Sequence, residues 1–193
     1  MEEDYWLIFT NMELKHLSEE IEIPDGVDVS LDNNILEIKG PKGSNKKDFT
    51  NFKVFLEKKE KKLKFTVDGV SRKSKDFLNS SISNFNNLVT GAKEGYVYKL
   101  KVCSGHFPMS VAIEKNKVII KNFIGEKVPR VANIIDGVSV KINSDIIIVE
   151  SSDKEKAGQV SANIETATRI TNKDRRVFQD GVFIIEKAGE PVQ

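Results

Sequence analysis

Three cations lie within four residues near the end of the chain, at Lys173, Arg175 and Arg176. Unpaired lysine and arginine side chains are costly to bury, so we expect this cluster at the surface. The planar guanidinium group of arginine can donate to two phosphate oxygens at once. A rigidly held cluster of this kind is therefore suited to phosphate recognition. An ordinary solvated turn is the alternative interpretation.

Further cations and one histidine could extend such a phosphate-binding surface to RNA. The candidates are Lys42, Lys46 and Lys47 in a glycine-containing loop, His106, Lys127 and Arg130 in the run GEKVPR, Lys154 and Lys156 at a helix start, and Arg169. A glycine loop lets a phosphate backbone approach main-chain N–H groups, although a basic surface hairpin is equally compatible with the pattern. Cations at a helix start favour a docked anion, with a solvated helix end as the alternative. We expect shape and backbone recognition, because side chains do not readily enter the deep major groove of A-form RNA.

The whole chain is nearly neutral, so its RNA affinity would depend on where the cations lie. The 193 residues carry 30 lysines and arginines, 29 aspartates and glutamates, and a net charge of +1. A hydrophobic content of 39% with 31% charged residues is typical of a folded protein. Local patches, and not the field of the whole molecule, must attract any nucleic acid.

Cysteine usage and the start of the chain indicate a cytoplasmic protein. The single cysteine, Cys103, excludes an internal disulfide and suits a reducing compartment. No apolar run approaches the roughly 18 residues of a membrane span. Glu2, Glu3 and Asp4 carry the wrong charge for a secretory signal. Met12 is a plausible alternative start, and residues 1–11 are then an N-terminal extension of unknown role.

Residues suited to catalysis or metal binding are few. His16 and His106 lie in separate regions, and the Cys103-x-x-His106 spacing has no second pair to complete a zinc site. Neither a phosphate-binding Walker loop, a GxGxxG motif nor a nucleophile elbow is present. We therefore predict no enzymatic activity, no cofactor and no bound metal. His106 is expected to stack on RNA or to form a hydrogen bond with it.

Two parts of the chain repeat the same pattern of strands. The run 23–29 aligns without a gap with 107–113: each has an apolar residue, proline, two spacers, valine, a spacer and a β-branched residue. A second strand follows each run, over 35–39 and 117–121, and then a loop with glycine and lysine. Such a correspondence indicates an internal duplication.

A helix is expected at the end of each copy. Apolar residues at helical spacing predict the first helix over 76–90, with Gly91 and Gly95 ending it and Phe77 among its buried residues. Asp153 is expected to cap the second helix, whose buried side includes Ala157, Val160, Ser161, Ile164 and Ala167. Asp180-Gly181 is expected to form a turn, and 182–185 a short strand that holds the basic cluster against the domain.

These patterns predict the α+β class. We expect two tandem copies of a unit in which an antiparallel or mixed β-sheet packs on one α-helix. The expected boundaries are 12–92 for the first repeat, 93–172 for the second repeat, and 173–193 for a basic C-terminal segment with a short strand and a tail.

The end of the chain resembles a family signature. The pattern Lys173-x-x-Arg176-x-Phe178-x-Asp180-Gly181, with the apolar run and Lys187, resembles the C-terminal signature of the large-subunit ribosomal protein six family, in its archaeal and eukaryotic branch. Similar family segments are GPKG, GAKEGYVYKLKV, HFPMSV, NFIGEKVPR and DKEKAGQVSANIETATRI. The resemblance spans about residues 12–187 and is closer to the archaeal type. Two departures are the small run Cys103-Ser104-Gly105, where Tyr-Ser is expected before His106, and Thr166, where glutamine is expected.

The resemblance implies a structural protein of the large ribosomal subunit. Its implied partners are large-subunit rRNA, near the sarcin–ricin loop and the stalk base, and neighbouring ribosomal proteins there, with no membrane and no small-molecule substrate. Docking would occur mainly through the C-terminal half. The alternative is a small-chaperone-like, β-rich protein-interaction module. The two predicted helices disfavour it, since such sandwiches are nearly all β.

Overall fold

The computed structural model describes residues 16–50 and 54–192, which form two compact units. The described residues of the first unit are 16–39 and 46–86, and those of the second are 40–45 and 87–192. The proposed extension over residues 1–11 and the alternative start at Met12 lie outside the described residues. No helix in the described part of the chain is long and apolar enough to cross a membrane.

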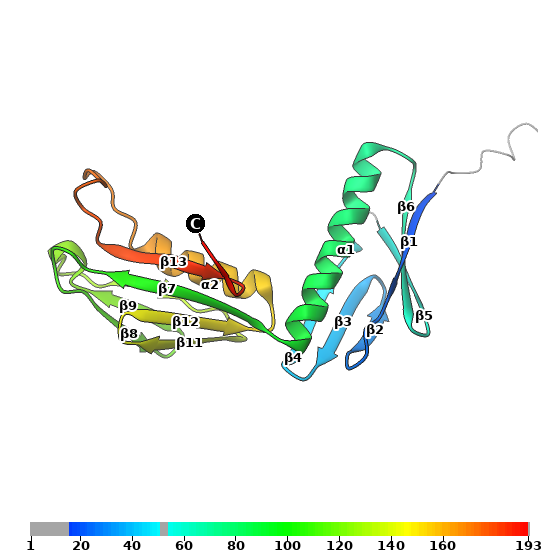
Figure 1. The fold of residues 1–193 in the computed structure, drawn as a ribbon, viewed down its shortest axis with the longest axis horizontal. Coiled ribbons are helices and arrows are strands. Elements are labelled where there is room, and N and C mark those ends of the chain that lie inside the picture. The colour runs from blue at the N-terminus through cyan, green and yellow to red at the C-terminus, as the bar shows by residue number, and fades with distance from the viewer. Residues whose placement is uncertain (1–15, 51–53, 193) are drawn as a thin grey trace, which may run out of the picture. The chain divides into compact units, whose positions relative to one another are not determined.

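The first unit has two antiparallel sheets and most of a long helix (Figure 1). One sheet has the order β1 (His16–Glu22), β6 (Lys62–Asp68), β5 (Val54–Lys59). The other has the order β2 (Asp28–Asp32), β3 (Ile35–Gly40), β4 (Gly43–Asp48). Helix α1 follows over Arg72–Lys93. The Phe65 ring meets Phe49 and Phe85 edge-on in the core, at centroid distances of 6.5 and 5.9 Å.

The second unit repeats this arrangement and adds to it. Its larger sheet has the order β11 (Val138–Asn143), β12 (Ile146–Ser151), β7 (Tyr96–Cys103), β13 (Gly181–Lys187), β14 (Glu190–Pro191). The smaller sheet has the order β10 (Arg130–Asn133), β9 (Lys117–Lys121), β8 (Ser110–Glu114). A short 3₁₀ turn covers Phe123–Gly125, and helix α2 covers Lys154–Ala167. Figure 1 shows α2 along one face of the larger sheet.

The strand orders confirm the predicted duplication and the α+β class. The order β5-β6-β1 corresponds to β11-β12-β7, and β2-β3-β4 corresponds to β8-β9-β10. One helix follows each set of strands. Strand β13 is the addition: it pairs antiparallel with β7, with Val182 opposite Val102. In the described part of the first unit, no strand occupies the equivalent place beside β1.

Helix α2 begins where the sequence predicts. The Asp153 carboxylate accepts hydrogen bonds from the backbone N–H groups of Glu155 and Lys156, which is the geometry of an N-cap. The buried residues of α2 are Ala157, Val160, Ser161 and Ile164, all predicted, while Ala167 is half-buried.

Helix α1 is longer than predicted, and Gly91 lies inside it. The helix covers 72–93 where the sequence predicts 76–90. A Cβ atom at Gly91 would overlap the Ser152 carbonyl oxygen, so glycine is needed there for close packing and not to end the helix. Gly95, with φ of +77°, follows the helix and adopts the left-handed conformation that favours glycine.

Two other expectations for the first repeat are wrong. Phe77 is 38% exposed, whereas Ser81, four residues later, is fully buried. The Ser81 hydroxyl donates to the Phe77 carbonyl oxygen at 2.9 Å. The segment 43–48 is strand β4 and not part of a loop. Its sequence, GSNKKD, has no apolar residue, so backbone pairing with β3 forms the strand without any alternating pattern.

Candidate nucleic-acid interface

The basic cluster lies on a turn built by Asp174, between α2 and β13. The Asp174 carbonyl oxygen accepts from the N–H groups of Val177 at 3.1 Å and Phe178 at 2.9 Å. Its carboxylate accepts from the Arg176 N–H at 2.9 Å. The side chains of Lys173, Arg175 and Arg176 are exposed, as predicted. The turn therefore fixes the backbone beneath three cations that face the solvent.

Asp180 and Gly181 do not form the expected turn: Gly181 begins strand β13, and Asp180 before it is buried. Only 2% of Asp180 is exposed. Its Oδ1 accepts from the backbone N–H groups of Gly105 and His106, and its Oδ2 lies 2.6 Å from His106 Nδ1. Burial alone would raise the pKa of Asp180, but the hydrogen bonds from His106 and Gly105 outweigh it and hold the pKa below its usual value. This carboxylate joins the loop after β7 to the start of β13.

His106, Phe178 and Lys173 form one group of contacts. The rings of His106 and Phe178 lie 5.1 Å apart, inclined at 33°. The Lys173 Nζ lies 4.6 Å from the centre of the Phe178 ring, within the range of a cation–π contact. The half-buried Phe178 therefore packs within the domain and places Lys173 and His106 on one surface.

Arg130 has a structural role that no sequence pattern indicates. Its Nε and Nη2 donate to the Glu126 carboxylate at 2.8 and 2.6 Å. Its Nη1 donates to the carbonyl oxygens of Ala167 at 2.9 Å and Arg169 at 3.1 Å. The guanidinium carbon lies 4.3 Å from the centre of the Phe123 ring. Arg130 thus ties the loop 123–130 to the C-terminal end of α2.

The Glu126–Arg130 pair also stabilises the charged form of each partner. The hydrogen bond from Arg130 is the largest influence on the pKa of Glu126, which lies below its usual value; the positive charge of Lys173 contributes in the same direction. The hydrogen bond to Glu126 raises the pKa of Arg130. Lys127, which is exposed, lies on the same loop as Glu126.

The structure gathers only part of the predicted RNA-binding set at one end of α2. We call this the α2 C-terminal surface; its residues are His106, Lys127, Arg130, Arg169, Lys173, Arg175 and Arg176. Lys154 and Lys156 lie at the opposite end of α2, whose 14 residues span about 20 Å. Lys42 belongs to the second unit, whereas Lys46 and Lys47 belong to the first unit.

The start of α2 is less open to an anion than expected. Asp153 already accepts from the N–H groups of Glu155 and Lys156. The Lys154 Nζ lies 3.2 Å from Asn87 Oδ1 and 5.7 Å from the centre of the Tyr96 ring. A docked anion would therefore have to compete with the Asp153 carboxylate for the backbone donors.

The glycine loop around Lys42 serves close packing within the second unit. A Cβ atom at Gly40 would lie 2.5 Å from the Ala92 carbonyl oxygen, to which the Lys42 N–H donates at 3.0 Å. Asn45 Nδ2 donates to the Ser152 carbonyl oxygen at 2.8 Å, and the Ser152 hydroxyl lies 2.8 Å from Asn45 Oδ1. The Lys42 N–H is therefore not available to a phosphate, and any contact there must come from the side chain.

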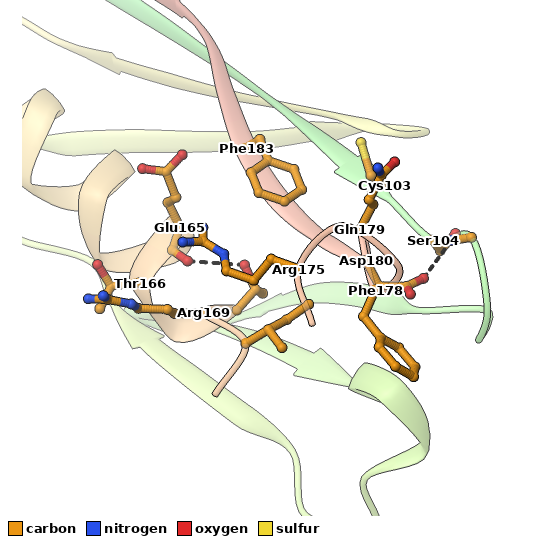
Figure 2. Close-up of a pocket in the computed structure, with 13 residues that line it drawn as sticks. Cys103, Ser104, Glu165, Thr166, Arg169, Arg175, Phe178, Gln179, Asp180 and Phe183 are labelled. Carbon is orange, nitrogen blue, oxygen red and sulfur yellow. Dashed lines mark hydrogen bonds between the residues drawn. The ribbon is translucent and has the colours of Figure 1, made fainter. Parts of the chain in front are cut away.

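A pocket of about 860 Å³ lies within the α2 C-terminal surface (Figure 2). The exposed side chains of Arg169 and Arg175 line it, and within the described part of the chain neither makes an ion pair. Cys103, Ser104 and Thr166, where the chain departs from the family pattern, also line this pocket. Among the described residues, no three histidine, cysteine or acidic side chains are grouped so as to hold a metal ion.

Positive charge is in excess in the second repeat together with the C-terminal segment. Residues 96–187 contain 15 lysines and arginines and 11 aspartates and glutamates, a net charge of +4, while the whole chain carries +1. The near neutrality of the whole chain therefore conceals an excess of positive charge in the half that contains the α2 C-terminal surface.

Comparisons with known proteins match both the second repeat and most of the chain. The family model described as "Ribosomal protein L6" matches residues 107–181. The chain is 43% identical over 177 residues to "Large ribosomal subunit protein uL6" of Sulfurisphaera tokodaii, covering 91% of this chain and 95% of the relative. It is 37% identical over 171 residues to the protein of that name from Methanobrevibacter smithii, covering 89% and 96%.

The relatives confirm the predicted ribosomal family and its archaeal type. They also exclude the chaperone-like alternative, because the match to this chain spans more than nine-tenths of the length of each relative. The role is structural and not enzymatic, and the place of the protein is the large ribosomal subunit. The chain belongs to the ribosomal protein L6 family.

Proposed function

We propose that this large-subunit protein binds large-subunit rRNA through the α2 C-terminal surface, near the sarcin–ricin loop and the base of the stalk. The observation that carries the proposal is a set of exposed cations on a backbone that is fixed from beneath. Arg169, Lys173 and Arg175 make no ion pair within the described residues, so their charge remains available to phosphates. The position within the subunit is inferred from the resemblance of the C-terminal signature.

Two internal contacts support the proposal by fixing the geometry of the surface. The Asp180 carboxylate holds the loop that carries His106, and Arg130 holds the loop that carries Lys127. Preorganised side chains lose less entropy when they bind, so more of their interaction with phosphate appears as affinity. A surface built in this way fits a structural role in which the protein stabilises assembled rRNA.

A double substitution tests the proposal directly. Arg175→Ala with Arg176→Ala is expected to weaken binding to archaeal large-subunit rRNA. The slope of log affinity against log salt is expected to fall by roughly one unit for each phosphate that the variant no longer neutralises. Filter binding across a salt series measures both quantities. The matched control is Lys73→Ala with Lys75→Ala, which removes two exposed cations from α1.

The control fixes the interpretation of this experiment. The Lys73, Lys75 variant is expected to keep the affinity and the salt slope of the wild type. Equal binding by the wild type and the Arg175, Arg176 variant, with both proteins folded, would remove the basic turn from the interface.

A further inference from the structure

The pocket in the α2 C-terminal surface combines an aromatic side chain with unpaired cations. Its volume of about 860 Å³ falls within the roughly 300–1,000 Å³ of pockets that bind small ligands. Figure 2 shows Phe183 on β13, Arg169 after α2 and Arg175 in the loop around it. A pocket of this size can hold more than a single phosphate group.

Phe183 supplies an exposed apolar surface at the pocket, with its ring packed on Gly181. The residue is 38% exposed although it lies within strand β13. Its ring packs so closely on Gly181 that a Cβ atom there would lie 3.0 Å from the ring. Half-buried Ile170 adds to the apolar lining. Exposed aromatic rings beside cations are the usual platform on which an unstacked nucleic-acid base lies.

The polar groups of the pocket favour a ligand with both phosphate and amino groups. Arg169 and Arg175 present guanidinium groups without ion pairs in the part of the chain that the structure describes. Asp180 is fully occupied by His106 and Gly105. Glu165 accepts from the Ile184 N–H through Oε1 at 3.2 Å, so its Oε2 can accept from the amino group of a base.

We propose that this pocket binds one unpaired nucleotide of large-subunit rRNA, with its base against Phe183 and its phosphate against Arg169 and Arg175. The proposal rests on the proposed function and names the form of RNA that the surface recognises. An unpaired base presents a flat ring and polar edges together, whereas paired A-form RNA presents mainly phosphates and 2′-hydroxyls. The Arg169 and Arg175 guanidinium groups can each donate two hydrogen bonds to phosphate oxygens.

Substitution of Phe183 separates base stacking from phosphate attraction. Phe183→Leu keeps an apolar side chain and removes the ring, whereas Phe183→Tyr keeps the ring. Phe55→Leu is the matched control, because Phe55 is 55% exposed on β5 of the first unit. The full chain is bound to archaeal large-subunit rRNA, and three quantities are measured: affinity, its salt slope, and the reactivity of unpaired bases to dimethyl sulfate.

Removal of the Phe183 ring is expected to weaken binding by roughly tenfold and to leave the salt slope unchanged. One unpaired base, protected by the wild type and by Phe183→Tyr, becomes reactive with Phe183→Leu. Arg169→Ala is a second variant, since the side chain of Arg169 is exposed and makes no ion pair among the described residues. It is expected to expose the same base and, unlike Phe183→Leu, to lower the salt slope.

Each other outcome overturns the inference. A wild type that binds no rRNA overturns the proposed function itself. A wild type that binds, with affinities and protected bases unchanged in Phe183→Leu and Arg169→Ala, overturns the pocket alone. Binding of AMP to the free protein with rRNA binding unaffected by Phe183→Leu identifies a site for free nucleotides instead. If the Phe183→Leu protein binds rRNA normally but is missing from large subunits, the pocket contacts a neighbouring protein and not an unpaired nucleotide.

Discussion

At the scale of single residues, two buried or half-buried side chains hold the loops of the α2 C-terminal surface in place. Asp180 holds the loop after β7, and Arg130 holds the loop before β10. Neither needs to touch RNA to affect its binding. The sequence predicted other roles for them: Asp180 as part of a turn, which the structure does not show, and Arg130 as a phosphate contact, which stays a prediction.

Asp180→Asn is expected to destabilise the second unit by about 1–3 kcal/mol at neutral pH, because a buried, multiply bonded carboxylate loses its charge. The pKa of Asp180 is lowered in the folded state, so its contribution is complete above the unfolded pKa of about 3.9 and is lost as the pH falls through the lower folded value. Urea unfolding at several pH values measures this.

The pH series contains its own check. The difference between the wild type and Asp180→Asn is expected to shrink below about pH 4. Asp32→Asn, an exposed carboxylate on β2, is the control and is expected to change stability little. A difference that persists unchanged into acid would contradict an ionic role for Asp180.

Arg130 and Lys127 are expected to give opposite results although they share a loop. Arg130→Ala leaves the Ala167 and Arg169 carbonyl oxygens without their donor and is expected to cost about 1–3 kcal/mol of stability. Lys127→Ala is expected to leave stability within about 0.5 kcal/mol and to weaken rRNA binding. Thermal unfolding and filter binding on both variants check this; full stability in Arg130→Ala would refute its structural role.

At the scale of elements, glycine positions show where helices approach other parts of the second unit. Gly91→Ala is expected to destabilise the protein by about 1–3 kcal/mol, because its Cβ would overlap the Ser152 carbonyl oxygen. Gly158→Ala in α2 is the matched control. Its nearest neighbour would be the Tyr98 hydroxyl at 3.4 Å, so the gain in helix propensity is expected to leave stability equal or higher.

Chemical denaturation of the two glycine variants provides the comparison. If Gly91→Ala were as stable as Gly158→Ala, the close contact between α1 and the Ser152 backbone would not be a constraint on the fold.

The same elements show what a sequence can and cannot predict. Helix α2 and strand β13 were predictable, because a capping aspartate, helical spacing and an apolar run are local signals. Strand β4 was not, since it has no apolar residue and depends on its neighbour β3. The roles of Gly91, Arg130 and Asp180 depend on partners 37 to 75 residues away in the chain. No local pattern encodes such contacts.

At the scale of the whole molecule, the duplication accounts for the repeated scaffold but not for the proposed interface. Both repeats have the same strand order and one helix each, but β13 and the basic turn before it lie only in the second among the residues that the structure describes. The excess positive charge lies there too. This asymmetry explains how a chain with a net charge of +1 can present a cationic surface, and it agrees with docking through the C-terminal half.

The structure of an assembled archaeal large subunit that contains this protein, determined by electron cryomicroscopy, tests the central claim most directly. We predict that Arg169, Lys173 and Arg175 lie within ion-pair distance of rRNA phosphates and that the pocket beside Phe183 holds one unpaired base. A structure in which the α2 C-terminal surface faces solvent, or contacts only a neighbouring protein, would contradict this claim.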